Sequence, residues 1–441
     1  MDGAAVRLPS RRERSAPLPG AAHARHGPTQ YTGDFTRDTG NRAPSASTHN
    51  NRMDVEWLTS TDGADTIAIA TRLLDDDPDR AGIALARVVE DPHRRALALT
   101  QAQLRGIAVA KFGPDAAALY YTRDGLEQAS RRVVADRRAR LFVENGARVV
   151  ADLCCGIGAD AFALARVGLD VEAVDADAGT AALAAANASA IGLADRLRVH
   201  HGDALHFDLS AVDSVFCDPA RRKDGRRVFD PRDYSPPLDA VWSAAGPRLT
   251  AVKVAPGIAH DAIPDGAAAE WVSVDGDVVE AALWRGRAGQ ANRTAVVFRG
   301  GEAIELTGTG RRDADVGGLG EYVYEPDGAV IRARLVAELG DLIGARLAHP
   351  TIAYLYRDAP ATTPLAVGWR IREVLPFHVK KLRGVLRERG IGRLTIKKRG
   401  ADVSPDKLRR ELRLSGADEA TLIVTRDGDR HVALLCDAAP V

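Results

Sequence analysis

The segment that organises the chain is Val149-Val150-Ala151-Asp152-Leu153-Cys154-Cys155-Gly156-Ile157-Gly158. Its first half is apolar, ends in an acid and predicts a short buried strand, and the glycines after it predict a tight turn. Glycine has no Cβ, so a ligand can approach the backbone of such a turn closely. In open α/β sheets, ligands bind beyond the carboxyl ends of the strands, where this turn would lie.

Residues 146–300 alternate between strand and helix around this segment. The predicted helices are Ala159–Val167, Gly179–Ile191 and Pro237–Ala245. The further predicted strands are Val171–Asp175, Leu197–His200, Val212–Cys217, Leu249–Val254, Trp271–Val274, Val278–Trp284 and Thr294–Phe298. The early helical crossovers predict a parallel sheet with right-handed connections. The later strands follow one another too closely for helices, so they predict an antiparallel edge.

The composition is that of a soluble globular protein. The chain has 441 residues, of which 45% are hydrophobic and 27% charged, and this length predicts two or three domains. No apolar run reaches the ~20 residues of a membrane span, and nothing resembles a signal peptide. The four cysteines show neither zinc-ligand spacing nor a disulfide framework. We therefore expect a cytoplasmic protein with no membrane partner and no bound metal.

The regions on either side of 146–300 differ in character. Residues 1–52 are rich in Ser, Pro, Gly and Arg and are expected to be disordered. Met53 stands where foldable sequence begins, so 1–52 is interpreted as a gene-model extension, with a basic arm or a targeting peptide as the alternative. Residues 53–145 have a helical pattern, 301–320 are expected to form a linker, and 321–441 are expected to form a small α+β domain.

The formal net charge of zero conceals a basic C-terminal region. Between residues 370 and 413 there are fifteen Arg and Lys residues against five Asp and Glu residues. Such an excess favours contact with a polyanion, although it would also suit a solvated surface in an arginine-rich protein. The predicted RNA-binding residues here are Lys380, Lys381, Lys397, Lys398 and Arg399.

Four acids stand at the ends of four successive predicted strands, namely Asp152, Asp175, Asp203 and Asp218. At the first position a carboxylate would repel a pyrophosphate but attract the ammonium group of S-adenosylmethionine. Asp175 is placed to hold ribose hydroxyls, as in many nucleotide-binding sheets. Asp203, followed by Ala204, would accept hydrogen bonds from the adenine amine, and Asp218 would orient a nucleophile.

Each of these residues also has a purely structural interpretation. Asp152 could cap the turn that follows it, and Asp175 could begin the Ala-rich helix. Asp203 and the pair Asp218-Pro219 could be ordinary turn residues. Upstream, Thr122 could cap a short helix, or it could belong to a lid that closes over a ligand bound at the glycine turn.

The segment Asp152–Gly158 resembles motif I of class I S-adenosylmethionine-dependent methyltransferases, and its Cys-Gly-x-Gly form is similar to RNA-modifying branches such as trimethylguanosine synthases. From about residue 53 the chain resembles a bacterial methyltransferase family that ends in a THUMP-like domain. The resemblance implies a Rossmann-like α/β sheet of seven strands with the last strand antiparallel, and an RNA substrate. It also implies that the backbone at Cys154, Cys155, Gly156 and Gly158 packs against the cofactor.

The segment Asp218-Pro219-Ala220-Arg221 departs from the Asp/Asn-Pro-Pro-aromatic form of amino-group methyltransferases. Arg221 replaces the aromatic ring, and its guanidinium plane can stack on a base or pair with a phosphate. Arg222 is predicted to assist. The segment also resembles uracil-5 methyltransferases, which require a cysteine nucleophile after the fifth strand. That region begins Lys253-Val254-Ala255 and contains no cysteine, so covalent attack is disfavoured.

These observations predict a methyltransferase that uses S-adenosylmethionine and acts on a base of tRNA or rRNA. Asp218, Pro219 and Arg221 are its expected catalytic residues. Two alternatives remain from the sequence: a small-molecule methyltransferase whose C-terminal domain supports dimerisation, and a non-catalytic RNA-binding protein that retains the fold.

Overall fold

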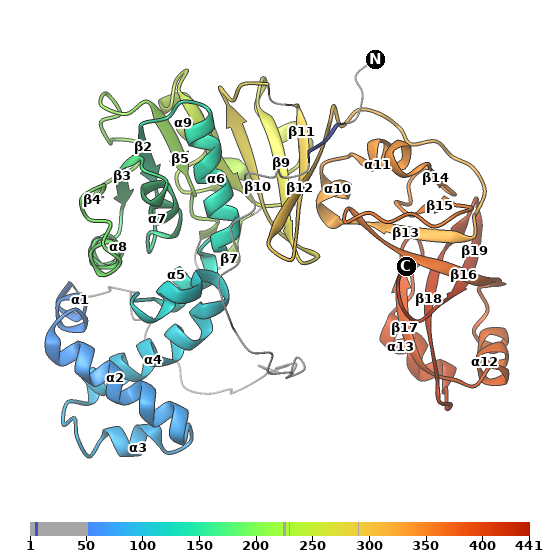
Figure 1. Cartoon of the computed structure of the whole chain (residues 1–441), viewed down its shortest axis with the longest axis horizontal. Coiled ribbons are helices and arrows are strands. Elements are labelled where there is room, and N and C mark those ends of the chain that lie inside the picture. The colour runs from blue at the N-terminus through green and yellow to red at the C-terminus, as the bar shows by residue number, and fades with distance from the viewer. Residues whose placement is uncertain (1–4, 8–51, 224–225, 229, 290) are drawn as a thin grey trace, which may run out of the picture.

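In the computed structural model, residues 5–7, 52–223, 226–228, 230–289 and 291–441 are described. They form an N-terminal group of helices, a large mixed sheet with helices on both faces, and a smaller C-terminal sheet (Figure 1). Most of the segment expected to be disordered, 1–52, lies outside the described residues. Within it, Ala5–Arg7 form strand β1, which pairs with the edge of the large sheet.

The N-terminal region is helical, as the sequence predicts. The elements are α1 (Arg52–Leu58), α2 (Thr61–Asp76), α3 (Ala81–Leu85), α4 (Pro92–Phe112), the 3-10 helix η1 (Gly113–Ala117), α5 (Arg123–Gln128) and α6 (Arg132–Glu144). Ser60 caps helix α2 by accepting a hydrogen bond from the Gly63 N–H at 3.2 Å. Asp91 caps helix α4 in the same way by accepting one from the His93 N–H.

The large sheet contains all the strands predicted between residues 149 and 298. Its order is β1-β12-β11-β9-β10-β8-β5-β2-β3-β4. The strands are β2 (Val149–Leu153), β3 (Asp170–Asp175), β4 (Leu197–His201), β5 (Ser214–Cys217), β8 (Leu249–Val254), β9 (Ala268–Val274), β10 (Asp277–Arg285), β11 (Arg293–Arg299), β12 (Glu302–Gly308) and β1. Strands β4, β3, β2, β5 and β8 are parallel, and β10 lies antiparallel between β8 and β9.

The seven neighbouring strands β4, β3, β2, β5, β8, β10 and β9 form the expected sheet, and β10, the last of them in sequence, is the antiparallel strand. Strands β11, β12 and β1 extend this sheet. Strand β12 lies in the predicted linker 301–320, so that expectation is wrong for residues 302–308. The reason is the pair Gly300-Gly301, whose φ angles of 57° and 85° form a two-residue hairpin turn between β11 and β12. Ile304 and Leu306 of β12 are then buried in the core.

Helices cover both faces of the large sheet. Helices α6, α7 (Ala159–Arg166) and α8 (Ala178–Ala190) pack on one face, and α9 (Leu238–Ala244) packs on the other. The chain turns from one side of β2 to the other between β4 and β5. This topological switch, at the carboxyl ends of β2 and β5, is where doubly wound sheets bind ligands. Two short strands, β6 (Arg222–Lys223) and β7 (Arg226–Arg227), form a separate hairpin after it, and the 3-10 helices η2 (Pro231–Asp233) and η3 (His260–Ala262) lie in connecting segments.

The C-terminal sheet has the order β14-β15-β13-β16-β19-β18-β17. The predicted order of helix, strand, helix, strand and strand over residues 377–435 is confirmed. The elements are β13 (Tyr322–Pro326), α10 (Gly328–Arg332), α11 (Val336–Ile343), β14 (Arg346–Leu347), β15 (Leu355–Arg357), β16 (Ala366–Pro376), α12 (Val379–Glu388), β17 (Ile391–Lys398), α13 (Pro405–Leu412), β18 (Asp418–Asp427) and β19 (Arg430–Cys436).

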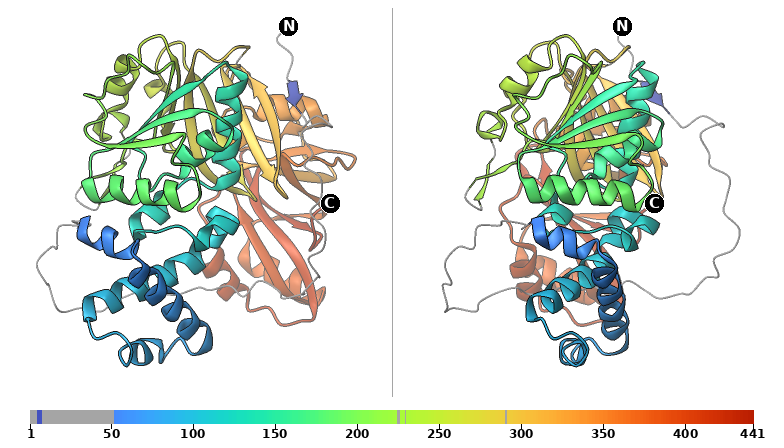
Figure 2. Two further views of the ribbon diagram at one scale, coloured as in Figure 1. Left: turned by 60° about the vertical axis from the view of Figure 1, so that its left-hand side comes forward. Right: turned by 90° about the vertical axis from the view of Figure 1, so that its left-hand side faces the viewer.

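The boundary predicted at residue 320 is not a break in the hydrophobic core. Val330 of α10 and Leu339 of α11 belong to the same buried cluster as Trp271 and Val297 of the large sheet. Helices α12 and α13 instead cover the C-terminal sheet itself. Helices α1–α4 and strands β16–β19 both extend below the large sheet, on the side where α5 lies (Figures 1 and 2).

Candidate active site

A cavity of about 240 Å³ lies at the carboxyl ends of β2, β3 and β5, against helix α5. Most of the predicted cofactor and catalytic residues line it. They are Thr122, Asp152, Cys154, Cys155, Gly156, Asp175, Asp218, Pro219 and Arg221. Residues as far apart in the sequence as Thr122 and Arg221 therefore meet in one cavity. This cavity lies at the switch point of the sheet, where the order of the strands predicts a ligand site.

The glycine turn after β2 forms the floor of this cavity. Cys154, Gly156 and Gly158 have positive φ angles of 67°, 56° and 97°. A Cβ at Gly156 would meet open space, whereas one at Gly158 would lie 2.4 Å from the ring of Phe162. Gly158 does not line the cavity, so its predicted contact with the cofactor stays a prediction, whereas its local role is visible. It begins α7 and lets Phe162 pack beneath the turn.

Asp152 is the most unusual group in the cavity wall. Its side chain is 0% exposed, and neither carboxylate oxygen has a hydrogen-bond partner among the described residues. Burial, together with the nearby carboxylates of Asp160 and Asp218, raises the pKa of Asp152 well above its usual range. A buried carboxylate without a partner is costly, and a cationic ligand in the cavity would supply what it lacks.

Asp175 joins β3 to the glycine turn. Its Oδ2 accepts a hydrogen bond from the Gly156 N–H at 3.0 Å, and its Oδ1 accepts one from the Asp177 N–H at 3.0 Å. Burial raises the pKa of Asp175, although these two hydrogen bonds oppose the shift. The capping role at the Ala-rich helix falls to Asp177, which accepts from the Thr180 N–H. Asp175 is thus left facing the cavity, as predicted for a residue that holds ribose hydroxyls.

Asp203 does not line the cavity, and its predicted contact with adenine stays a prediction that this geometry does not support. Its side chain is 59% exposed, accepts a hydrogen bond from the Leu205 N–H at 2.8 Å, and contacts His206 at 3.1 Å. Ala204 is buried but likewise lies outside the cavity lining. The turn that follows β4 uses the Asp203 carboxylate for its own backbone, so the turn interpretation holds for this residue.

The capping interpretation of Thr122 is confirmed, and its role in a lid stays a prediction. Its Oγ1 accepts a hydrogen bond from the Gly125 N–H at 3.0 Å and caps α5, and the residue also lines the cavity. Helix α5 lies directly on the glycine turn, since a Cβ on Gly125 would come within 2.5 Å of Ile157. Helix α5 is therefore in close contact with the turn, and Tyr121 before it is buried in the core.

Asp218 forms an ion pair that the sequence did not predict. Its Oδ2 lies 2.7 Å from Nζ of Lys253 on β8, whose side chain is 4% exposed. Burial alone would lower the pKa of Lys253, but nearby carboxylates, above all Asp218 and Glu280, outweigh it and raise that pKa. Sequence reasoning considered this position only for the absence of a cysteine. A lysine within the otherwise uncharged strand Leu249–Val254 was the available signal.

The Lys253 ammonium is held by residues at the junction of α5 and α6. It donates to Ser130 Oγ at 3.0 Å and to the Gln128 carbonyl at 3.4 Å. Ser130 in turn donates to Asp160 at 2.7 Å, and Asp160 pairs with the buried Arg138. Arg138 also pairs with Glu280 of β10. This chain of buried charges fixes the wall behind Asp218, because each member is already partnered.

Arg221 lines the cavity and has a buried Nη1 with no hydrogen-bond partner among the described residues. Pro219 is buried between Asp218 and the exposed Ala220. Arg222 begins strand β6, and its side chain lies outside the described part of the structure.

The predicted basic surface of the C-terminal region is divided. Lys397 pairs with Glu325 at 2.6 Å and lies over the ring of Trp369, and Arg399 lies near the same carboxylate at 3.8 Å. Neighbouring Leu394 and Ile396 face the opposite side of the sheet, where α12 packs. Lys380, Lys381 and Lys398 are exposed and have no ion pair in the described chain. Only these three remain available as predicted.

Comparison with known proteins identifies the chain. An uncharacterized S-adenosylmethionine-dependent methyltransferase of Mycobacterium tuberculosis is 36% identical over 318 residues, which is 70% of this chain and 85% of that protein. The chain is an S-adenosylmethionine-dependent methyltransferase. Residues 150–227 of the methyltransferase match a methyltransferase-domain family, and residues 366–438 match a THUMP domain-like family.

Two further matches are informative to different degrees. The crystal structure of a candidate methyltransferase from Porphyromonas gingivalis superposes with a TM-score of 0.68 at 22% identity, covering 85% of this chain and 98% of that one, which shows a shared fold. A 23S rRNA (uracil(1939)-C(5))-methyltransferase of Acidithiobacillus ferrooxidans is 33% identical over 102 residues. This match covers 22% of the methyltransferase and 23% of that relative.

The cavity fits the cofactor of this family. The unpartnered carboxylate of Asp152 suits the ammonium group of S-adenosylmethionine, and Asp175 suits its ribose. The space above Gly156 is open, so a cofactor can contact the backbone of the turn at this position. Within the described residues, no group of His, Cys, Asp and Glu side chains could hold a metal, and no helix is long and apolar enough to cross a membrane.

Proposed function

We propose that the methyltransferase modifies a base of RNA, in tRNA or rRNA, and that Asp218 orients the accepting atom. The observation that carries this proposal is that Asp218 and the glycine turn line one cavity. The THUMP domain-like match and the exposed basic residues of the same region favour RNA over a small molecule. The limited similarity to an rRNA methyltransferase points in the same direction.

Bound S-adenosylmethionine supplies a methyl group already activated by its sulfonium, so the protein's task is to position and to stabilise charge. Asp152 and Asp175 hold the two ends of the cofactor. Lys253 holds the Asp218 side chain in place through their ion pair, so that the carboxylate can accept a hydrogen bond from the incoming base. Arg221 stacks on the base or contacts its phosphate.

Covalent catalysis by cysteine, as in carbon-5 methylation of uracil, is not part of this proposal. Cys217 is 0% exposed and does not line the cavity, and burial raises the pKa of its thiol well above the usual range. Position 253, near the carboxyl end of β8, the fifth strand of the family fold, carries the lysine that pairs with Asp218. We therefore expect direct transfer to a base atom that needs no protein nucleophile.

The test uses full-length protein, S-adenosylmethionine labelled in its methyl group, and total RNA from a strain that lacks the gene. We expect label in one RNA size class and in one modified nucleoside after digestion. Asp218→Ala should abolish transfer while leaving cofactor affinity nearly unchanged, and Asp203→Asn, outside the cavity, should retain transfer. Label found only in small metabolites, or in no fraction, would reject the proposal.

A further inference from the structure

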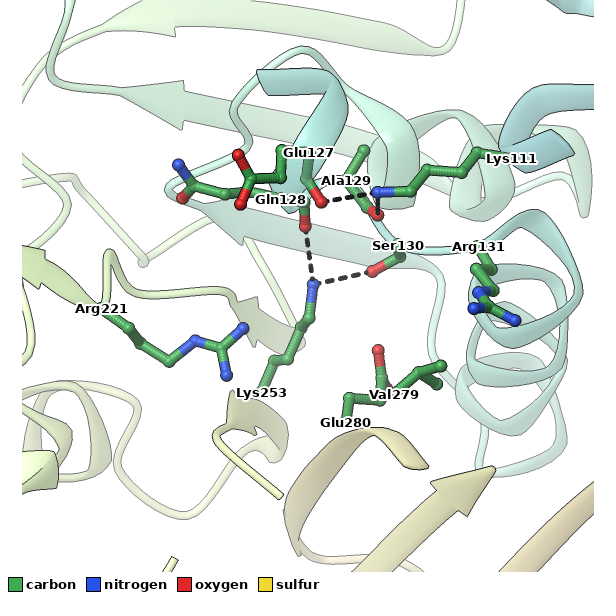
Figure 3. A pocket seen from close by; sticks show the side chains of 10 residues that line it. All are labelled: Lys111, Glu127, Gln128, Ala129, Ser130, Arg131, Arg221, Lys253, Val279 and Glu280. Atoms are coloured by element: carbon green, nitrogen blue, oxygen red, sulfur yellow. Dashed lines mark hydrogen bonds between the residues drawn. The ribbon is translucent and has the colours of Figure 1, made fainter. Parts of the chain in front are cut away.

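A second cavity, of about 310 Å³, adjoins the first, and we call it the cationic pocket (Figure 3). Its charged lining consists of Lys111, Arg131, Arg221, Lys253, Glu127 and Glu280. These residues come from α4, α5, the segment before α6, β8 and β10, together with the segment after β5. The cationic pocket therefore shares α5 and the segment after β5 with the active-site cavity, whereas α4, β8 and β10 complete its wall.

The two cavities share walls. Gln128, Ala129, Ser130 and Arg221 line both of them. Asp218 lines the first cavity and Lys253 lines the second, and their charged atoms are 2.7 Å apart. A molecule that occupies the cationic pocket thus lies one side chain away from the carboxylate that orients the methyl acceptor.

Positive charge in the cationic pocket is only partly compensated. Lys253 pairs with Asp218 and Arg131 lies 3.6 Å from Asp277, whereas Lys111 and Arg221 make no ion pair within the described residues. The Lys111 ammonium donates to the carbonyls of Leu126, Glu127 and Ala129 at 2.7, 2.6 and 3.0 Å, so its hydrogen bonds go to neutral groups. Glu280 is already paired with Arg138 behind the pocket wall.

Two observations favour the binding of an anion here. Nη1 of Arg221 is buried with no hydrogen-bond partner among the described residues. Burial, together with the positive charges of Lys253 and Arg131, lowers the pKa of Lys111 to about 8. A bound group with negative charge and several acceptor oxygens would accept a hydrogen bond from Arg221 and would offset the positive charge around Lys111.

We propose that the cationic pocket binds a phosphate group of the nucleotide that is methylated, while the base of that nucleotide enters the cavity beside Asp218. This inference rests on the proposed action on RNA. A phosphate presents acceptor oxygens in several directions, which suits donors that arrive from separate elements, and an RNA nucleotide carries its phosphate close to its base. Arg221 would then donate to the phosphate, and Lys111, whose three N–H donors are held by carbonyls, would attract it by charge; both would act as substrate-positioning residues.

The experiment is calorimetric titration of the full-length protein, saturated with S-adenosylhomocysteine, at low salt. The probes are the four nucleoside 3′-monophosphates and the matching nucleosides. We expect a nucleotide to bind at least about tenfold more tightly than its nucleoside, because charge-assisted hydrogen bonds are lost with the phosphate. Equal affinity of nucleotides and nucleosides would overturn the inference.

Two variants and a control locate the effect. Lys111→Gln and Arg221→Gln should each remove most of the preference for the nucleotide, whereas Arg80→Gln, an exposed arginine on the N-terminal helices, should not. Retained affinity for S-adenosylhomocysteine in Lys111→Gln shows that the variant is folded, since Lys111 does not line the cofactor cavity. An unchanged preference in both pocket variants would exclude this pocket as the phosphate site.

Competition by a mixed-sequence RNA oligomer separates the two sources of phosphate. Displacement of the nucleotide by RNA supports an RNA phosphate, and binding of nucleotides without displacement assigns the pocket to a small phosphorylated substrate and overturns the inference. The assay does not use methyl transfer. If RNA becomes labelled in the transfer assay but nucleotides bind no more tightly than nucleosides, the phosphate site alone is refuted. If nucleotides bind more tightly but RNA is not labelled, the proposed function alone is refuted.

Discussion

Replacement of Asp152 by Asn should have opposite effects on cofactor affinity and on the stability of the free protein. In the free protein, the buried carboxylate has no hydrogen-bond partner among the described residues, and its neighbours include the carboxylates of Asp160 and Asp218. Asn is nearly the same size and carries no charge. The substitution therefore relieves an unfavourable charge in the free protein and removes a favourable one from the complex.

The magnitudes follow from the burial of this one group. A hydrogen bond to a charged partner contributes about 1.5–3 kcal/mol, so the Kd for S-adenosylmethionine should rise by about 10- to 150-fold in Asp152→Asn. In the free protein, removal of an unpaired buried charge should add about 1 kcal/mol to the free energy of unfolding. That corresponds to a rise in Tm of ~2 °C at pH 8.

The stability effect should depend on pH in a defined direction. The pKa of Asp152 in the folded protein lies above the value of 3.8 for an unperturbed carboxyl group. Between these two pKa values the unfolded chain loses the proton and the folded chain keeps it, so the free energy of unfolding falls as pH rises. Asp152→Asn should lose this part of the pH dependence, and its advantage in Tm should disappear near pH 4.

Isothermal titration calorimetry and thermal denaturation measure the two effects on the same samples. Asp203→Asn is the matched control, because its exposed carboxylate lies outside the cavity, and we expect its cofactor affinity to change less than about twofold. Cofactor affinity that is the same in Asp152→Asn and in the wild type would refute the assignment of Asp152 to the ammonium group. A loss of affinity in Asp203→Asn as large as that in Asp152→Asn would show that Asp203 contacts the cofactor although it lies outside the cavity lining.

Three further predictions concern the turn, the buried ion pair and the cationic pocket. Gly158→Ala should lower the free energy of unfolding by at least ~3 kcal/mol in denaturant titrations, because its Cβ would clash with the ring of Phe162. Gly156→Ala, where the Cβ would meet open space, should lower it by about 1–2 kcal/mol. Equal losses in the two variants would contradict the close packing of the Phe162 ring on the turn. Lys253→Met should lower methyl transfer to RNA by about 100-fold or more with little change in cofactor affinity, since Asp218 loses the partner that holds it; unchanged transfer would exclude this role. Phosphate affinity should fall as pH rises through about 8, because Lys111 loses its proton there. Lys111→Arg should abolish that fall, because arginine stays charged. The other charged groups that face this position are unchanged in the variant, namely Lys253, Arg131, Glu127 and Glu280.

The sequence was sufficient to predict the architecture and part of the site. Hydrophobic periodicity and the glycine turn predicted the parallel strands, the crossover helices and the place where they bind a ligand, because these patterns are local. Acids at strand ends predicted Asp152, Asp175 and Asp218 as one group, since the carboxyl ends of parallel strands meet at one edge. The same reasoning placed Asp203 in this group, but its carboxylate accepts a hydrogen bond from its own turn and does not line the cavity.

What the sequence by itself determined is therefore the order of elements and the edge of the sheet at which chemistry takes place. Tertiary structure alone decided that Lys253 neutralises Asp218, that residues 128–130 form a wall common to two cavities, and that Lys397 is occupied by Glu325. The physical reason is that the charge and exposure of a side chain depend on neighbours that are distant in the chain. A strand pattern records which face is buried, but the partner that meets a buried charge is fixed only when the elements pack.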